Sequence, residues 1–129
     1  MSQENVEVVR RAFATAGPLT GAPDLALDAE FDFTALYPDQ PVLRGVDAMR
    51  AFRDAGPWGA SISFAPERYF RVDDERVLVF VCATASGQRS GTPVQTKLAQ
   101  EFTVQRGRIV RVKVHPDREQ ALKDVGLEE

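Results

Sequence analysis

The sequence is poor in the residues that build cross-links and metal centres. Its 129 residues include one cysteine, Cys82, and one histidine, His115. A single cysteine cannot form an intrachain disulfide, and one histidine with one cysteine cannot supply the ligands of the usual zinc sites. No spaced cluster of carboxylates suggests a calcium-type site. We therefore expect no disulfide framework, no metal and no other cofactor.

The sequence also lacks a basic surplus and long apolar runs. It has 16 Lys and Arg against 19 Asp and Glu, a formal net charge of -3 and a pI near 5.2. Nucleic-acid binding needs a concentrated basic face, which this composition does not provide. Apolar stretches such as residues 77–83 are far shorter than the roughly 20 residues that cross a bilayer, and the first residues are polar. We expect one cytoplasmic domain over residues 1–129, with no nucleic-acid or membrane partner.

Helical patterns occur in four segments. Apolar side chains recur at helical spacing over residues 2–16 and 45–56, and a Gly-Pro pair stops each pattern. A short second helix is predicted over residues 22–28, because a proline occupies its first turn. A tail helix is predicted after Asp117, which acts as N-cap and forms a capping box with Gln120.

Strand patterns fill most of the remaining chain. Residues 31–37, FDFTALY, alternate between two faces, and residues 61–114 contain four apolar, β-branched segments separated by short turns. Together with the helices they predict an α+β fold, with helices on one face of a curved antiparallel sheet. Residues 77–83 are apolar on both alternating faces, so the second face also needs a cover. We predict that a second copy supplies it, in a homodimer formed through the sheet.

Three strings suggest a family: MSQENVEVVRRAF, VLRGVDAMRAF and FTVQRGRIVRVKVHPDREQAL. In this order and spacing the chain resembles, over nearly its whole length, the SnoaL-like branch of the nuclear-transport-factor-2-like superfamily, which is related to ketosteroid isomerases and polyketide cyclases. The resemblance implies a cone-shaped half-barrel, a cystatin-like α+β roll whose helices pack on the concave face of the sheet and enclose one apolar pocket. Because this fold hosts isomerases, cyclases, epoxide hydrolases, dehydratases and proteins without catalysis, it names no reaction.

The resemblance also allows a comparison of site positions. Ketosteroid-isomerase-like relatives use a carboxylate on the first strand, where this chain has Ala35 or Tyr37, and a tyrosine on the first helix, where it has Arg10 and Phe13. The resemblance thus implies no steroid-isomerase mechanism, and whether the chain is an enzyme stays open. Many SnoaL-like relatives carry a pocket-facing histidine at the position of Gln100. Glutamine can form hydrogen bonds but cannot transfer a proton near neutral pH.

Gln100 is the main candidate for ligand binding. It shares its alternating strand face with apolar residues, so it is a single polar group on an apolar wall, which is typical of a ligand pocket. The Tyr37 hydroxyl can donate to a ligand carbonyl, and Trp58, in the loop GPWG, can cover the pocket. Aromatic residues predicted to line the pocket, with core packing as the alternative, are Phe13, Phe33 and Phe102.

Asp32 and His115 are the candidates for a general base. Asp32 lies between two phenylalanines, which suggests a desolvated carboxylate, although alternation points it away from the phenylalanine face. His115 follows the alternation of Arg111, so a surface or rim position on the outer face is the alternative to a base at the pocket mouth. Glu101 alternates with Gln100 and is expected to pair with Lys97 or Arg111 on the outer face.

These residues leave three functions open. The first is binding of a small hydrophobic ligand with a carbonyl group, held by Gln100, Tyr37 and Trp58. The second is a cofactor-independent isomerase or cyclase, in which Asp32 or His115 removes a proton next to a carbonyl. The third is a non-catalytic dimeric interaction module. An ionisable group that points into the pocket would favour the second over the first.

Overall fold

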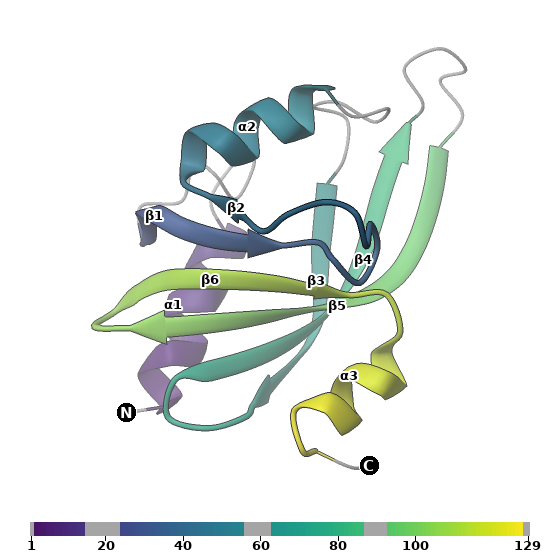
Figure 1. Ribbon diagram of the computed structural model, residues 1–129. Helices are drawn as coiled ribbons and strands as arrows, with labels where there is room; N and C mark the ends of the chain where they lie inside the picture. Colours follow the sequence, from purple (N-terminus) through teal and green to yellow (C-terminus); the bar gives the residue numbers. More distant parts are fainter. Residues whose placement is uncertain (1, 15–23, 56–62, 87–92, 128–129) are drawn as a thin grey trace.

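The computed structural model describes residues 2–14, 24–55, 63–86 and 93–127 (Figure 1). The described residues form three helices and six strands in an α+β arrangement. In chain order they are α1 (Ser2–Ala14), β1 (Leu25–Asp32), β2 (Leu43–Arg44), α2 (Val46–Ala55), β3 (Ser63–Arg71), β4 (Arg76–Ser86), β5 (Pro93–Gln105), β6 (Arg108–His115) and α3 (Arg118–Asp124).

The six strands form one curved, unclosed sheet in the order β2-β1-β6-β5-β4-β3 (Figure 1). Strands β3 to β6 make the expected antiparallel meander. Strand β1 pairs with β6 in the parallel direction, which the predicted antiparallel sheet did not include. The β5–β6 hairpin turns through Arg106 and Gly107, whose φ values of 54° and 76° suit the right-handed twist of the strands.

The prediction of a helix over residues 22–28 is wrong. Of these residues, 24–28 are described, and from Leu25 on they belong to β1. The backbone N of Ile109 donates to Asp24 O at 2.8 Å, and Gly45 N donates to Ala29 O at 2.8 Å. Asp24, directly before β1, is thus bonded to β6, and Ala29, just after the expected helix, is bonded to Gly45 on the other side. Pairing within a sheet outweighs the weak helical preference of so short a segment.

The strand expected over residues 31–37 ends at Asp32. The Asp32 carboxylate accepts hydrogen bonds from the backbone N of Thr34 at 2.9 Å and from its Oγ1 at 2.6 Å. Leu36 N and Tyr37 N both donate to Phe33 O. A side chain that binds the backbone two residues on favours a turn over a strand, so the chain leaves the sheet here.

The two faces of the sheet differ in what covers them. Helices α1 and α2 pack on one face and share a core with it, and we call this side the apolar face. Its residues on the central strands are Val77, Val79, Val81, Leu98, Gln100, Phe102, Val112 and Val114. The expectation that the helices lie on one face holds for α1 and α2 only.

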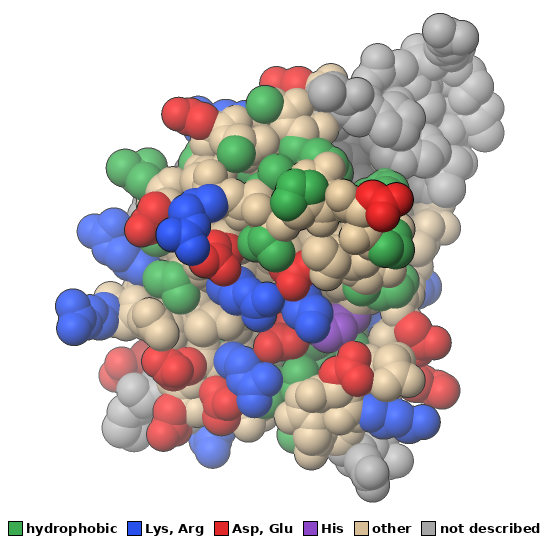
Figure 2. Space-filling view, in the orientation of Figure 1, with side chains coloured by type: hydrophobic (Ala, Val, Ile, Leu, Met, Phe, Trp, Pro, Cys, Tyr) green, Lys and Arg blue, Asp and Glu red, His purple; other side chains and the backbone are tan. Residues whose placement is uncertain are grey.

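Helix α3 lies on the opposite side, which we call the charged face after Asp32, Arg76, Glu101, Arg111 and His115. Figure 2 shows this face, with acidic and basic side chains interleaved and the histidine among them. Leu122 of α3 and Val125, which follows this helix, pack with Leu78 of β4 in a second core. The second apolar face of residues 77–83 is therefore covered in part by the chain itself.

Helix α3 is fastened at its first turn. Asp117 is the expected N-cap, and its carboxylate accepts from Gln120 N at 3.0 Å. The Gln120 side chain donates to Asp124 instead of closing a capping box. Arg118 donates to Val81 O at 2.8 Å and to Leu98 O at 3.2 Å, so it binds the helix to two neighbouring strands.

Candidate functional site

Gln100 lies in the middle of the apolar face. In the register of the sheet it pairs with Val79 on β4 and Val114 on β6, while Leu98 and Phe102 precede and follow it on the same face of β5. These four neighbours are buried, and Gln100 itself is only 4% exposed. The structure thus surrounds one primary amide with apolar side chains.

The Gln100 amide is not fully satisfied within the described part of the protein. Its Oε1 is buried and has no hydrogen-bond partner, the only such side-chain atom found among the described residues. Leaving a buried acceptor unpaired costs about 1–3 kcal/mol, so such groups are rare and point to a functional constraint.

Two groups of aromatic rings extend the apolar face from this position. The Phe13 ring of α1 meets the Phe102 ring edge-on, with centroids 5.6 Å apart. Phe33, which follows β1, stacks on Phe52 of α2 at 5.2 Å, and the half-exposed Tyr37 contacts Phe52 at 6.1 Å. Phe52 was not among the predicted site residues, although the helical period of α2 places it on the buried side. Trp58, the remaining predicted contact, lies outside the described residues.

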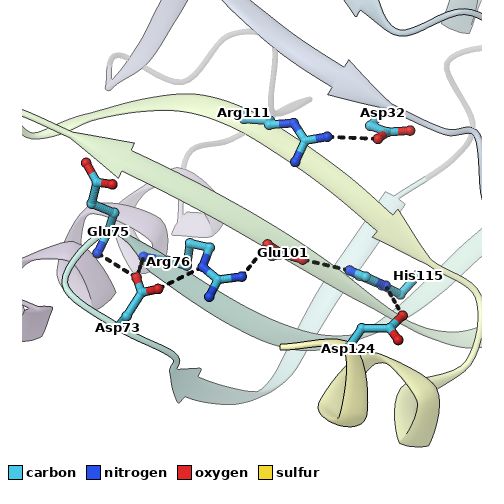
Figure 3. Close-up of polar contacts among 8 residues, drawn as sticks. All are labelled: Asp32, Asp73, Glu75, Arg76, Glu101, Arg111, His115 and Asp124. Atoms are coloured by element: carbon cyan, nitrogen blue, oxygen red, sulfur yellow. Dashed lines mark hydrogen bonds and ion pairs between the residues drawn. The ribbon is translucent and has the colours of Figure 1, made fainter. Parts of the chain in front are cut away.

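Asp32 lies beside Arg111 on the charged face (Figure 3). The sheet register places Gln100 on the opposite face. It is 6% exposed, and besides the two hydrogen bonds from Thr34 it accepts one from Arg111 Nη2 at 2.9 Å. Burial alone would raise the pKa of Asp32, but the Thr34 hydrogen bonds and the Arg111 guanidinium outweigh it and bring that pKa below its usual value. Asp32 is therefore a fixed carboxylate that ties β1 to β6.

His115 also lies on the charged face and is buried, 4% exposed. Its Nε2 is 2.9 Å from Glu101 Oε1, and its Nδ1 is 3.8 Å from Asp124 Oδ2 (Figure 3). The outer face was predicted for this residue, but the expected surface or rim position is wrong. Helix α3 folds back over the end of β6, and its Asp124 lies beside the His115 ring, so the ring is buried.

Glu101 has different partners from the expected ones. Lys97 pairs with Glu67, and Arg111 pairs with Asp32. The Glu101 carboxylate contacts His115 on one oxygen and Arg76 Nη1 at 3.4 Å on the other. The hydrogen bond with His115, followed by that from Arg76, lowers the pKa of Glu101 against the opposing effect of burial.

The arrangement separates the predicted bases from the predicted ligand contact. Asp32 and His115 are on one side of the sheet and Gln100 is on the other. Arg111 binds the Asp32 carboxylate, and Glu101 is hydrogen-bonded to the His115 ring. The prediction that either acts as a general base beside Gln100 has no support in this geometry. Among the residues with described positions, no group of three potential metal ligands is found. No described helix is long and apolar enough to span a membrane.

No protein-family model matches the sequence, and no curated protein matches it either. Solved structures do match the fold. An NTF2-like protein of unknown function from Burkholderia pseudomallei has a TM-score of 0.68 and 21% identity, over 95% of this chain and 98% of that one. The epoxide hydrolase/cyclase-like enzyme SalBIII has a TM-score of 0.71 and 17% identity, over 92% and 95% of the two chains. TerC, co-crystallised with polyporic acid, has a TM-score of 0.70 and 17% identity, over 95% and 97%.

The chain therefore has the NTF2-like fold, which SnoaL-like polyketide cyclases and ketosteroid-isomerase-like proteins share. The resemblance suggested by the three sequence strings is confirmed at this level. The fold hosts several chemistries, so function has to be argued from the site.

Proposed function

We propose that this protein binds a small hydrophobic ligand on the apolar face of its sheet, with Gln100 as the polar contact. The observation that carries the proposal is the buried Oε1 of Gln100, which has no partner in the described structure. A ligand pocket usually combines apolar walls with a few polar groups that orient the ligand. Gln100 among buried valine, leucine and phenylalanine side chains has this composition.

The structural neighbours support a small molecule as the ligand. TerC was crystallised with polyporic acid, and SalBIII is described as an epoxide hydrolase/cyclase-like enzyme in pyran ring formation. The partly exposed Phe13 ring would give a planar or ring-containing ligand a contact surface. A carbonyl group on that ligand can accept a hydrogen bond from Gln100 Nε2.

We propose binding rather than proton abstraction as the activity of this site. A general base must lie within about 3 Å of the proton that it removes, or one water away. The two predicted bases, Asp32 and His115, are held on the charged face by Arg111 and Glu101. Glutamine cannot replace them as a proton carrier near neutral pH.

A thermal-shift screen against polyketide, steroid and aromatic carbonyl compounds tests the proposal. A ligand at 100 times its Kd adds about 2.7 kcal/mol to the free energy of unfolding. We expect at least one compound to raise the Tm of the wild type and of Asp32→Asn, and to leave the Tm of Gln100→Met unchanged. A hit that still binds to Gln100→Met, or a screen without hits, would contradict the proposal.

We also propose that a second copy of the chain covers the part of the charged face that α3 leaves open. On that face β1 carries Glu30 and Asp32, and the neighbouring β6 carries Arg111 and Lys113. A two-fold axis along these strands would place the carboxylates of one copy over the cations of the other. Cys82 of β4 is incompletely buried on the same side.

Light scattering coupled to size-exclusion chromatography tests this pairing. We expect a dimer for the wild type and a monomer for Cys82→Arg, because the new cation would be buried between the two sheets. The matched control is Val42→Arg, at an exposed position outside the sheet. A monomeric wild type, or a Cys82→Arg dimer of unchanged stability, would overturn the pairing through this face.

A further inference from the structure

We infer that the ligand of the apolar face is uncharged and that its polar group holds a hydrogen-bond donor beside an acceptor, as in a lactam or an α-hydroxy carbonyl compound. The inference rests on the proposed function and specifies its ligand. It depends on the two atoms of the Gln100 amide and on the side chains around them.

The Gln100 amide requires more than a carbonyl from its ligand. A primary amide offers an acceptor, Oε1, next to a donor, Nε2. A ligand with only a carbonyl would bind Nε2 and leave Oε1 buried without a partner, as it is in the free protein. A hydroxyl or N–H group on the ligand removes this penalty, so the unpaired Oε1 selects for a donor.

The side chains around Gln100 disfavour a charged group. Its neighbours on the same face of β4, β5 and β6 are all apolar and buried; they are Val77, Val79, Val81, Leu98, Phe102, Val112 and Val114. None of them can neutralise an ionised carboxylate or ammonium. An unpaired charge in such surroundings costs far more than a neutral polar group, which needs only its hydrogen bonds.

The donor and the acceptor of the ligand have to be adjacent, because both bind the side-chain amide of Gln100. A lactam presents its N–H and C=O on the same side, in the arrangement that complements a primary amide. Both hydrogen bonds then form in one plane: the ligand N–H donates to Oε1, and Nε2 donates to the ligand C=O. An α-hydroxy carbonyl compound offers the same pair from two oxygens.

Isothermal titration with matched bicyclic probes tests this inference. 2-Quinolone has the N–H and C=O pair, 1-methyl-2-quinolone lacks the N–H, and 4-methyl-2-quinolone keeps it while adding the same methyl group. We expect the 1-methyl compound to bind the wild type about 10-fold more weakly than the 4-methyl compound, the usual effect of one lost hydrogen bond. The anion 2-naphthoate is expected to bind more weakly still.

The protein variants provide the second arm. In Gln100→Met the two methylquinolones are expected to bind within about 2-fold of each other, since the atom that distinguishes them is gone. Gln100→Leu serves the same purpose should the methionine variant fold poorly. Thr103→Val is the matched control, because it lies on the same strand but on the charged face, and it should keep the wild-type ratio.

Each alternative outcome identifies what fails. Equal affinity of the two methylquinolones for the wild type would overturn the donor requirement and leave the proposed function intact. Tighter binding of 2-naphthoate than of 2-quinolone would overturn the neutral ligand. Binding of 2-acetylnaphthalene without binding of any quinolone would reject the ligand class alone, whereas failure of all these probes would count against the proposed function as well.

Discussion

The two faces of the sheet treat buried polar side chains in opposite ways. On the charged face, Asp32, Glu101 and His115 are each buried and each paired. On the apolar face, Gln100 is buried and its Oε1 has no partner among the described residues. Gln100 and Glu101 are consecutive residues of β5, so the same strand contributes to both arrangements. Charges are harder to bury than an amide, and yet only the amide is left unpaired. We infer that the charged face serves stability and the apolar face serves binding.

The largest expected effect comes from breaking the charged face. His115→Ala would leave the buried Glu101 carboxylate with Arg76 as its remaining partner. Loss of a hydrogen bond to a buried carboxylate costs about 1.5–3 kcal/mol, and the cavity left by the buried ring brings the total to about 3–5 kcal/mol. We expect the free energy of unfolding, measured by urea denaturation, to fall by that amount. A loss below about 1 kcal/mol, the value of an exposed pair, would show that this face is not the source of stability.

Glu101→Gln keeps the shape of the side chain and removes its charge. Because His115 and Arg76 lower the pKa of Glu101 below 4.5, the ionised carboxylate stabilises the fold above that pH, and the benefit is lost as the pH falls through the lowered value. A hydrogen bond to a charged group contributes about 1.5–3 kcal/mol, so the variant should be less stable by that amount at pH 7. Urea denaturation from pH 7 to pH 3 should show that the difference in the free energy of unfolding between the wild type and Glu101→Gln becomes smaller. A gap independent of pH would contradict this assignment.

On the apolar face, a substitution is expected to stabilise the protein instead of destabilising it. Gln100→Met replaces the unpaired amide with an apolar side chain of similar size, so the free energy of unfolding should rise by about 1–2 kcal/mol. The same variant should lose its thermal response to ligands. Gain of stability with loss of binding is typical of a functional site. A less stable variant would mean that the amide has a structural partner, and the contrast between the faces would fail.

Alternation explains why part of this contrast could be predicted from the sequence. Successive side chains of a strand point to opposite faces, so the separation of Gln100 from Glu101 follows from local geometry alone. The antiparallel meander and helix α2 could be predicted for the same reason, because their patterns are periodic over many residues. The N-cap role of Asp117 is likewise local.

The partners on the charged face could not be predicted in this way. The pair of His115 with Glu101 depends on which residues of β5 and β6 lie opposite each other, and Asp124 reaches them only because α3 folds back over the sheet. Most of strand β1 was missed, because its main signal is its parallel pairing with β6, which is not a local property. Tertiary contacts determine both the partners of His115 and the position of β1, and a short window of sequence does not contain them.

The smallest expected effect on stability comes from weakening α3, the helix that covers part of the charged face. This change tests whether the two faces act independently. Asp117→Ala removes the carboxylate that accepts from Gln120 N at the start of α3. Loss of an N-cap costs about 1 kcal/mol, and Arg118 still binds the helix to Val81 O and Leu98 O, so α3 should stay in place. We expect urea denaturation to show this modest loss and titration with 2-quinolone to give the wild-type affinity. If the affinity changed as well, α3 would be coupled to the ligand site through the sheet, and the two faces would not act independently.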